Sequence, residues 1–132
     1  MDAALRELVR ERAGGCCEYC HLPQEFSELL FHIEHIIPRQ HCHDDTAENL
    51  ALACPAGNLV KGPNLTGIDP LTKQVTTLFH PRRNKWNEHF GYDDTRIVGK
   101  TSIGRTSVSL LRMNDAHRLR VRALLIASGN LD

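Results

Sequence analysis

The pattern of hydrophobic and polar positions predicts helices at both ends of the chain. Residues 2–13 have apolar residues at helical spacing, with Asp2 as the N-cap and two glycines directly after the stretch. The face that this helix buries is expected to consist of Leu5, Leu8 and Val9. Towards the other end, one helix capped by Thr101 or Ser102 is predicted to run through Met113. Asn114-Asp115 then interrupts or recaps the chain before a last helix that ends at Ala127.

Between these ends the pattern predicts short strands separated by polar loops. Apolar and aromatic residues predict a strand over 26–33, which reaches towards Glu34 and is closed by Pro38. A polar loop over 39–48 and a short strand over 49–53 follow, and a short helix is expected to begin near Pro55. The segment therefore predicts a strand–loop–strand–helix unit.

The rest of the chain predicts smaller elements of both kinds. They are a turn-rich segment at 64–73, a strand at 74–79, a helix from Pro81 with Trp86 and Phe90 on one face, a turn at 91–94, and a strand at 96–98. The fold class expected is α+β. No repeat, low-complexity tract or boundary divides the chain, so a single domain over 1–132 is predicted.

Composition indicates the class of protein and the compartment in which it is expected. Charged residues make up 24% and hydrophobic residues 41%, as in ordinary soluble proteins. No apolar run approaches the ~20 residues that span a membrane, and the start lacks the apolar core of a secretory signal, so a cytoplasmic location is expected. Five cysteines, an odd number, favour a reduced compartment and metal ligation over a disulfide framework.

Charge is unevenly distributed, although the net charge is zero. Residues 1–66 hold 5 Lys and Arg against 10 Asp and Glu, a balance of −5, and residues 67–132 hold 11 against 6, a balance of +5. This polarity is compatible with a basic face for nucleic acid in the second half, and equally with ordinary solvated helix faces.

Glu34 and His35 are the first candidates for chemistry. A carboxylate is a hard oxygen ligand for a divalent cation, and a neutral imidazole can take a proton from water near pH 7. Neighbours on a regular strand point to opposite faces, so the two side chains share a site only if the strand breaks near Pro38. The alternative is an unrelated pair on the surface.

Three further residues lie downstream. Asn58 falls inside the short helix, where asparagine is unfavourable, and its amide oxygen can complete a Mg²⁺ or Mn²⁺ site; the alternative is a helix cap. Lys61 follows on about the same face and can meet a phosphate, or simply be solvated. Asn49 is expected to bridge backbone groups of the loop that holds His35.

The thiols are candidates for zinc. Cys17 and Cys20 have knuckle spacing, and Cys54 is a third ligand, but Gly57 stands where a second knuckle needs its fourth thiol. The fourth ligand remains open between a water and three side chains, namely His21, Cys42 and His43. Loss of zinc, with Cys54 packed as a small hydrophobe, is the alternative.

Together, in this order and with these gaps, the residues resemble the HNH endonuclease family and its ββα-metal motif. The segments KGPNLTGIDP, LFHPRRNKWNEHF and IVGKTSIGRTSVSLLRMND extend the likeness to a small bacterial subgroup. The resemblance implies a ββα core at about 17–62 between an N-terminal helix and a basic helical extension at about 80–129. It also implies His35 as general base, Glu34 and Asn58 as ligands of Mg²⁺, Mn²⁺ or Ni²⁺, and Asn49 as loop organiser.

The function implied is hydrolysis of a DNA phosphodiester, with Arg82, Arg83 and Lys85 following the DNA backbone. Two other classes compete with it. One is a DNA-binding zinc module that keeps the HNH residues only as a scaffold. The other is a thiol redox or metal-sensing protein built on Cys16, Cys17 and Cys20, which gives Glu34, His35 and Asn58 no role. Sequence preference and oligomeric state leave no trace in the sequence.

Overall fold

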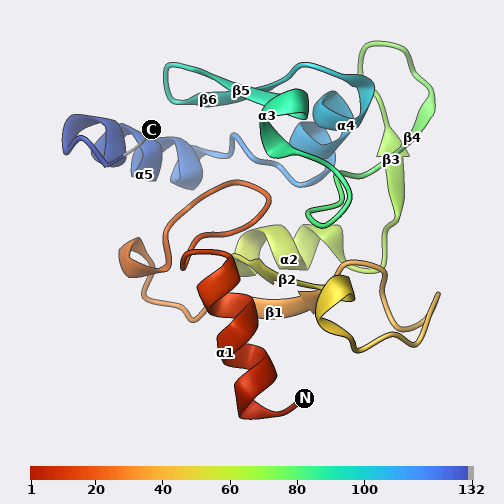
Figure 1. Cartoon of the computed structure of the whole chain (residues 1–132). Helices are drawn as coiled ribbons and strands as arrows, with labels where there is room; N and C mark the ends of the chain where they lie inside the picture. Colours follow the sequence, from red (N-terminus) through yellow and green to blue (C-terminus); the bar gives the residue numbers. More distant parts are fainter. Residues whose placement is uncertain (131–132) are drawn as a thin grey trace.

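The computed structural model describes residues 1–130 and contains helices and short strands in about equal number (Figure 1). In chain order the elements are α1 (Ala3–Arg12), β1 (His32–His35), β2 (Leu50–Ala53), α2 (Pro55–Lys61), β3 (Thr66–Ile68), β4 (Val75–Thr77), α3 (Trp86–His89), β5 (Phe90–Asp93), β6 (Arg96–Gly99), α4 (Ser102–Leu110) and α5 (Ala116–Ala127). The predicted α+β class is confirmed. No helix of the described residues is both long and apolar enough to cross a membrane.

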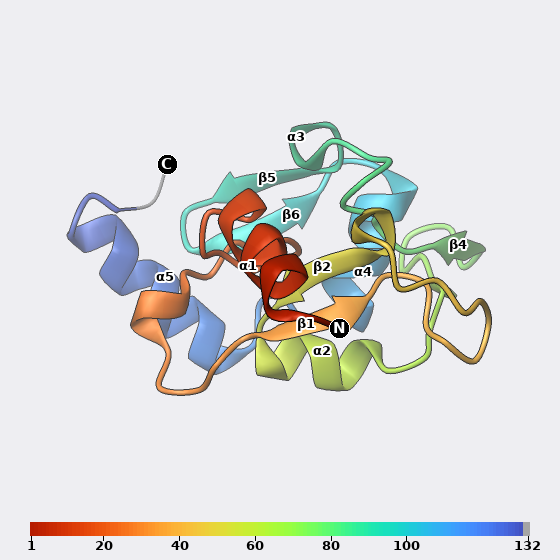
Figure 2. The same cartoon turned by 60° about the horizontal axis from the view of Figure 1, so that its bottom comes forward.

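Within the described part of the chain the strands form three separate antiparallel pairs: β1 with β2, β3 with β4, and β5 with β6. In the first pair His35 lies opposite Leu50 and His32 opposite Ala53. All four residues of β2 are buried, and α1 and α2 both pack against this hairpin (Figures 1 and 2). The strand–loop–strand–helix unit expected from the sequence is thus present as β1, β2 and α2.

The N-terminal helix forms as its sequence predicts. Asp2 caps α1 by accepting a hydrogen bond of 2.8 Å from the backbone N–H of Leu5. Gly14 adopts a left-handed conformation (φ 63°) that a residue with a side chain resists, and this ends the helix. Val9 is fully buried and Leu5 packs against the core, but Leu8 is 47% exposed, so the predicted buried face was wrong at that residue.

The first strand is shorter than expected and begins later. Instead of a strand over 26–33, the chain makes a 3₁₀ turn at Gln24–Phe26 and then a loop that leads into β1. The Gln24 side chain explains the difference. Its amide oxygen accepts from the N–H of Phe31 at 2.6 Å and its NH₂ donates to the carbonyl of Leu29 at 2.9 Å. These local bonds replace the strand-to-strand bonds that a longer β1 would need.

The segment after Pro81 also departs from expectation, because it makes a turn where a helix was predicted. His80 Nδ1 accepts from the backbone N–H groups of Arg82 and Arg83, at 3.1 and 3.2 Å. The helix is therefore delayed to the single turn α3, although the rings of Trp86 and Phe90 do meet, with centroids 5.1 Å apart. Sequence reasoning also missed β3 and β5, both short strands in segments that it assigned to turns.

The C-terminal helices begin at the expected capping residues. Thr101 caps α4 through the N–H of Gly104, and Asp115 caps α5 through the N–H of Arg118. The C-terminal half is joined to the N-terminal part by long-range contacts, among them a 2.9 Å hydrogen bond from the Trp86 indole to the carbonyl of Tyr19. The residues that carry chemistry lie in this N-terminal part.

Candidate active site and thiol cluster

Glu34, His35 and Asn58 line one open cleft of about 310 Å³ beside β1 and α2. Neighbouring side chains on a strand are expected to point to opposite faces, and those of Glu34 and His35 do so only in part. Glu34 is 8% exposed and points inward, whereas the half-buried His35 side chain turns towards the loop that follows β1. Both residues still border the same cleft, because β1 ends at His35.

His35 is held by Asp45, a residue that sequence reasoning did not select. Its Nε2 lies 2.7 Å from Asp45 Oδ1, and this hydrogen bond holds the pKa of the Asp45 carboxyl below its usual value. A proton on Nε2 leaves Nδ1 as the nitrogen that can accept another. The sequence signal that could have identified Asp45 is the acidic pair Asp44-Asp45. This pair lies in a loop that must fold back over His35 if Asn49 bridges the loop.

Asn49 is buried and ties that loop to the end of β1. Its amide oxygen accepts from the N–H of Ile37 at 2.9 Å, and its NH₂ donates to the carbonyls of Ile37 and Asp44 at 3.0 and 2.8 Å. Three bonds from one side chain fix the backbone on both sides of the loop, and therefore the position of Asp45 relative to His35.

Lys61 lies in the interior, not at the surface that the sequence analysis expected. Its side chain is 3% exposed, and its ammonium is 3.1 Å from Glu34 Oε2 and 2.9 Å from the carbonyl of Ile36. A buried ammonium needs such partners, and they draw it away from a position where it would meet a phosphate. Tyr19 completes the group by donating to Glu34 Oε1, and burial raises the pKa of Glu34.

The side chains of the cleft suit a hard divalent cation. Asn58 is half-buried on α2, and its side-chain amide makes no hydrogen bond to any residue among 1–130. Glu34 accepts from Tyr19 and Lys61, but a carboxylate has about four acceptor sites, so these contacts leave capacity for a cation. A carboxylate and a free amide oxygen beside one cleft are ligands of the type that Mg²⁺ and Mn²⁺ take.

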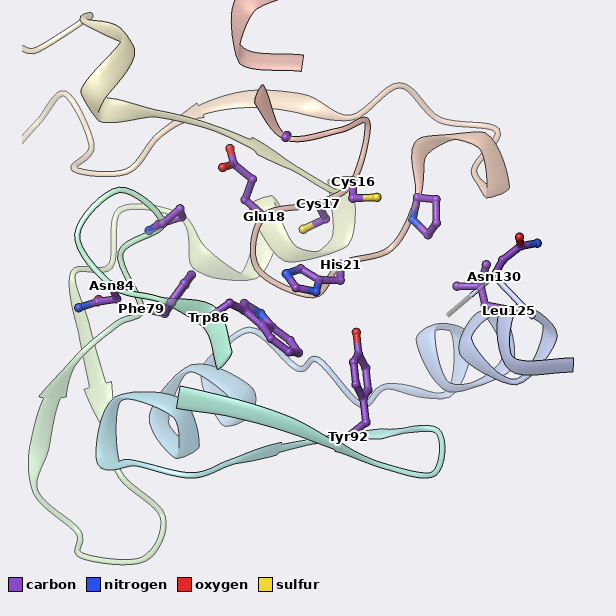
Figure 3. Close-up of a pocket in the computed structure, with 13 residues that line it drawn as sticks. Cys16, Cys17, Glu18, His21, Phe79, Asn84, Trp86, Tyr92, Leu125 and Asn130 are labelled. Atoms are coloured by element: carbon purple, nitrogen blue, oxygen red, sulfur yellow. The ribbon is translucent and has the colours of Figure 1, made fainter. Parts of the chain in front are cut away.

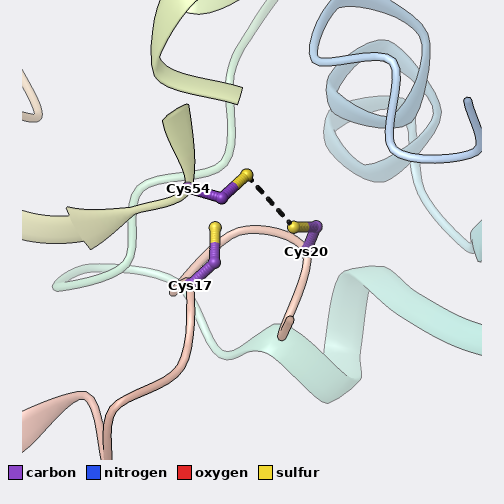
Figure 4. A group of neighbouring side chains, drawn as sticks. All are labelled: Cys17, Cys20 and Cys54. Carbon is purple, nitrogen blue, oxygen red and sulfur yellow. Dashed lines mark hydrogen bonds between the residues drawn. The ribbon is translucent and has the colours of Figure 1, made fainter. Parts of the chain in front are cut away.

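The three thiols predicted for zinc come together. Cys17, Cys20 and Cys54 are buried with all sulfurs within 4.8 Å of one another, and no other such group of His, Cys, Asp or Glu occurs among the described residues (Figure 4). The Cys20 and Cys54 sulfurs are 3.7 Å apart. Tetrahedral zinc with bonds of about 2.3 Å requires a sulfur separation of roughly 3.8 Å, so the geometry fits zinc.

The fourth-ligand candidates do not join this cluster. Cys42 is exposed, and His43 lies 3.7 Å from Asp45 in the loop over His35. The ring of His21 stacks on Trp86 with centroids 3.9 Å apart, and its nitrogens are outside the group of converging ligand atoms. Hydrogen bonds from the other two thiols lower the pKa of Cys54, which favours the thiolate that binds metals.

The basic residues of the second half are less available than the charge pattern suggested. Arg82 is largely buried and pairs with Glu18, and burial lowers its pKa to about 10. Arg118 and Arg122 are each 1% exposed. Arg83 and Lys85 are exposed, and Arg83 lines a cavity of about 310 Å³ together with Ile36 and Ile37, directly after His35. Of the predicted DNA-contacting group, two residues therefore remain accessible.

A larger cavity, of about 430 Å³ (Figure 3), shares no lining residue with the cleft beside His35. Trp86, Tyr92 and His21 line it, and it reaches Cys17 at the edge of the thiol cluster. None of the residues predicted for catalysis borders it. Size alone therefore does not identify the site, and the chemistry of the lining side chains favours the cleft beside His35.

One comparison with known proteins matches this unit. The HNH endonuclease family model matches residues 17–63, which run from the first cysteine of the cluster through β1, β2 and α2. These residues form an HNH domain. No curated protein and no solved structure matches the chain. The HNH domain indicates a nuclease or nucleic-acid-binding function, and domains of this kind bind divalent metals.

Proposed function

We propose that this protein is a metal-dependent endonuclease that hydrolyses DNA phosphodiester bonds in the cleft of its HNH domain. The observation that carries the proposal is that Glu34, His35 and Asn58 line one cleft inside the segment that matches the family. A base and two hard oxygen ligands are the groups that such a hydrolysis needs.

His35 is the general base of the proposed reaction. Its Nε2 is bonded to Asp45, so Nδ1 accepts the proton of the attacking water. Asn49 holds the loop that carries Asp45, which fixes the orientation of the imidazole ring. This division of roles resembles other sites in which a carboxylate sets the tautomer of a catalytic histidine.

Glu34 and Asn58 hold the divalent metal, Mg²⁺, Mn²⁺ or Ni²⁺, in this proposal. When bound, such an ion neutralises charge on the phosphate and stabilises the departing 3′-oxygen. Lys61 acts indirectly by fixing Glu34 and the backbone carbonyls after His35. Arg83 and Lys85 follow the DNA backbone without reading bases, and Arg82 keeps Glu18 in place.

The test is nicking of supercoiled plasmid by metal-free protein to which Mg²⁺ or Mn²⁺ is added back. Asn58→Ala removes one proposed ligand, so we expect it to need at least about 10- to 100-fold more metal for half-maximal nicking, which is the cost of losing even an outer-shell partner, with DNA binding unchanged. Asn64→Ala, which changes an exposed asparagine outside the cleft, is the control. An identical metal requirement in Asn58→Ala and wild type would remove Asn58 from the site.

Asp45→Asn tests the orienting carboxylate. The amide keeps the size of the side chain but can present NH₂ to Nε2, which favours the wrong tautomer of His35. We expect kcat for nicking to fall about 10- to 100-fold while KM for DNA stays the same. A loss of DNA affinity with unchanged kcat would mean that Asp45 acts on substrate binding instead.

A non-catalytic DNA-binding module is the second candidate, and one observation favours it. Both oxygens of Glu34 already have partners, Tyr19 and Lys61, so the carboxylate is stably placed without a metal. This candidate predicts that the protein binds plasmid and leaves it intact under every metal condition. The nicking assay therefore separates the two functions.

A further inference from the structure

Arg118 brings a charged group from α5 to the thiol cluster of the HNH domain. Its side chain is 1% exposed, and only one of its three nitrogens is satisfied, by a 2.7 Å hydrogen bond from Nη1 to the carbonyl of Leu111. Nε lies 3.6 Å from Asp115, beyond hydrogen-bonding reach, and Nη2 has no partner among the described residues. An unpartnered buried guanidinium is costly, so a further partner is expected.

The position of Nη2 indicates what that partner is. A Cβ placed on Gly57 would lie 3.6 Å from Nη2 and 3.2 Å from the Cys54 sulfur. Gly57 is the position where a second knuckle would carry its fourth thiol. The guanidinium therefore reaches the corner of the cluster from which a thiol is missing.

Charge balance agrees with this position. Zn²⁺ with four thiolates carries a net charge of −2, and with three thiolates it carries −1. The guanidinium of Arg118 is always charged in a protein, so a three-thiolate zinc site beside it is neutral. A neutral group of this kind is far less costly to bury than an isolated anion.

We propose that Arg118 takes the place of the fourth cysteine as an outer partner of a zinc site formed by Cys17, Cys20 and Cys54. When zinc is bound, the three thiolates would hold it and Nη2 would offer a hydrogen bond towards the corner beside Gly57. The cluster also ties α5 to the HNH domain through Arg118. The proposal is independent of nuclease activity and concerns only metal binding.

The number of thiolates can be counted directly. Protein loaded with Co²⁺ absorbs through sulfur-to-cobalt charge transfer, and the intensity rises with the number of bound thiolates. We expect one equivalent of metal in wild type with the intensity of three thiolates, and the intensity of four in Gly57→Cys. A wild-type protein that neither contains zinc nor takes up Co²⁺ would overturn the proposal, because Arg118 would then replace the metal itself.

The role of Arg118 is tested by zinc affinity, measured by competition with a chelator. Arg118→Leu is expected to weaken zinc binding about 10- to 100-fold, and Arg118→Lys, which keeps the charge, should lose less. Arg122→Leu is the comparison variant, because Arg122 is equally buried on α5 and its charge also acts on Cys20, but its Nη atoms bond to the carbonyls of Met113 and Thr95 instead of facing Gly57. Its effect on zinc affinity should be much smaller.

Equal zinc affinity in wild type and Arg118→Leu would overturn the role given to Arg118. Equal losses in Arg118→Leu and Arg122→Leu would do the same, because the effect would then come from buried charge or packing in general and not from the corner beside Gly57. If Arg118→Leu does not fold, Arg118→Lys and Gly57→Cys still decide the matter. A Gly57→Cys protein with the cobalt intensity of three thiolates would show that the corner beside Nη2 is not a ligand position.

Discussion

Lys61→Met is expected to lower the free energy of unfolding by about 3–5 kcal/mol, the usual cost of removing one partner from a buried ion pair. The side chains of Lys61 and Glu34 are both nearly inaccessible to solvent, and the ammonium also donates a hydrogen bond to the carbonyl of Ile36. Without Lys61 the Glu34 carboxylate keeps only Tyr19 as a partner, so a buried charge is left uncompensated. Domains of this size are stable by only about 5–15 kcal/mol, so the change should be plain in a urea titration.

The double variant Glu34→Gln/Lys61→Met separates the ion pair from simple packing. Removing both charges leaves no isolated carboxylate, so we expect the double variant to be more stable than Lys61→Met alone. Arg120→Met, which truncates an exposed cation on α5, is the control and should change stability by less than about 0.5 kcal/mol. A similarly small change in Lys61→Met would contradict the buried position of Lys61.

His35→Ala is expected to slow DNA cleavage about 10²- to 10⁴-fold, which is the usual contribution of a general base. Among the cleft residues within 1–130, the imidazole is the one group that is held by a carboxylate and still offers a nitrogen for a proton. The measurement is the single-turnover rate on a labelled DNA duplex at saturating Mg²⁺. DNA affinity should not change, because the proposed role of His35 concerns only the chemical step.

His32→Ala is the matched control for that experiment. His32 lies on the same strand, lines the same cleft and is exposed, but no hydrogen bond within residues 1–130 orients its ring. We expect its cleavage rate to remain within about twofold of wild type, since surface substitutions are usually near neutral. If both histidine variants lose activity equally, the loss cannot be assigned to a specific base.

Local signals in the sequence predicted the elements that carry the site. Asp2 and the glycines after residue 13 bounded α1, and Pro55 marked the start of α2. Such signals act over a few residues, and the caps and turns that they specify formed as expected. The order of Glu34, His35, Asn49 and Asn58 also predicted the family that the comparison found.

Contacts between residues that are distant in the chain could not be predicted from these local signals. Tyr19 bonds to Glu34, Lys61 turns inward, and Asp45 reaches His35, although none of these partners adjoins the other in the chain. A charged residue at the end of a short helix is normally solvated, so nothing local distinguished Lys61. Its partners are supplied by the β1–β2 hairpin and exist only in the folded chain.

The second half of the chain shows the same limit for charge. Its excess of Lys and Arg was equally compatible with a basic face for nucleic acid and with ordinary solvated helix faces. In the structure Arg105 donates hydrogen bonds to the carboxylate of Asp69, and Arg122 donates to backbone carbonyls inside the fold. Part of the basic excess is therefore structural, and a count of charges could not separate it from residues that remain free to meet DNA.

The most direct test of the nuclease proposal is to follow wild-type protein on supercoiled plasmid, measuring binding and strand cleavage in the same samples with Mg²⁺, with Mn²⁺ and with EDTA. We expect nicked circles to accumulate only in the samples with metal, while the protein binds plasmid in all of them. Plasmid that is bound and stays intact under every metal condition, with His35→Ala behaving identically, would contradict the account.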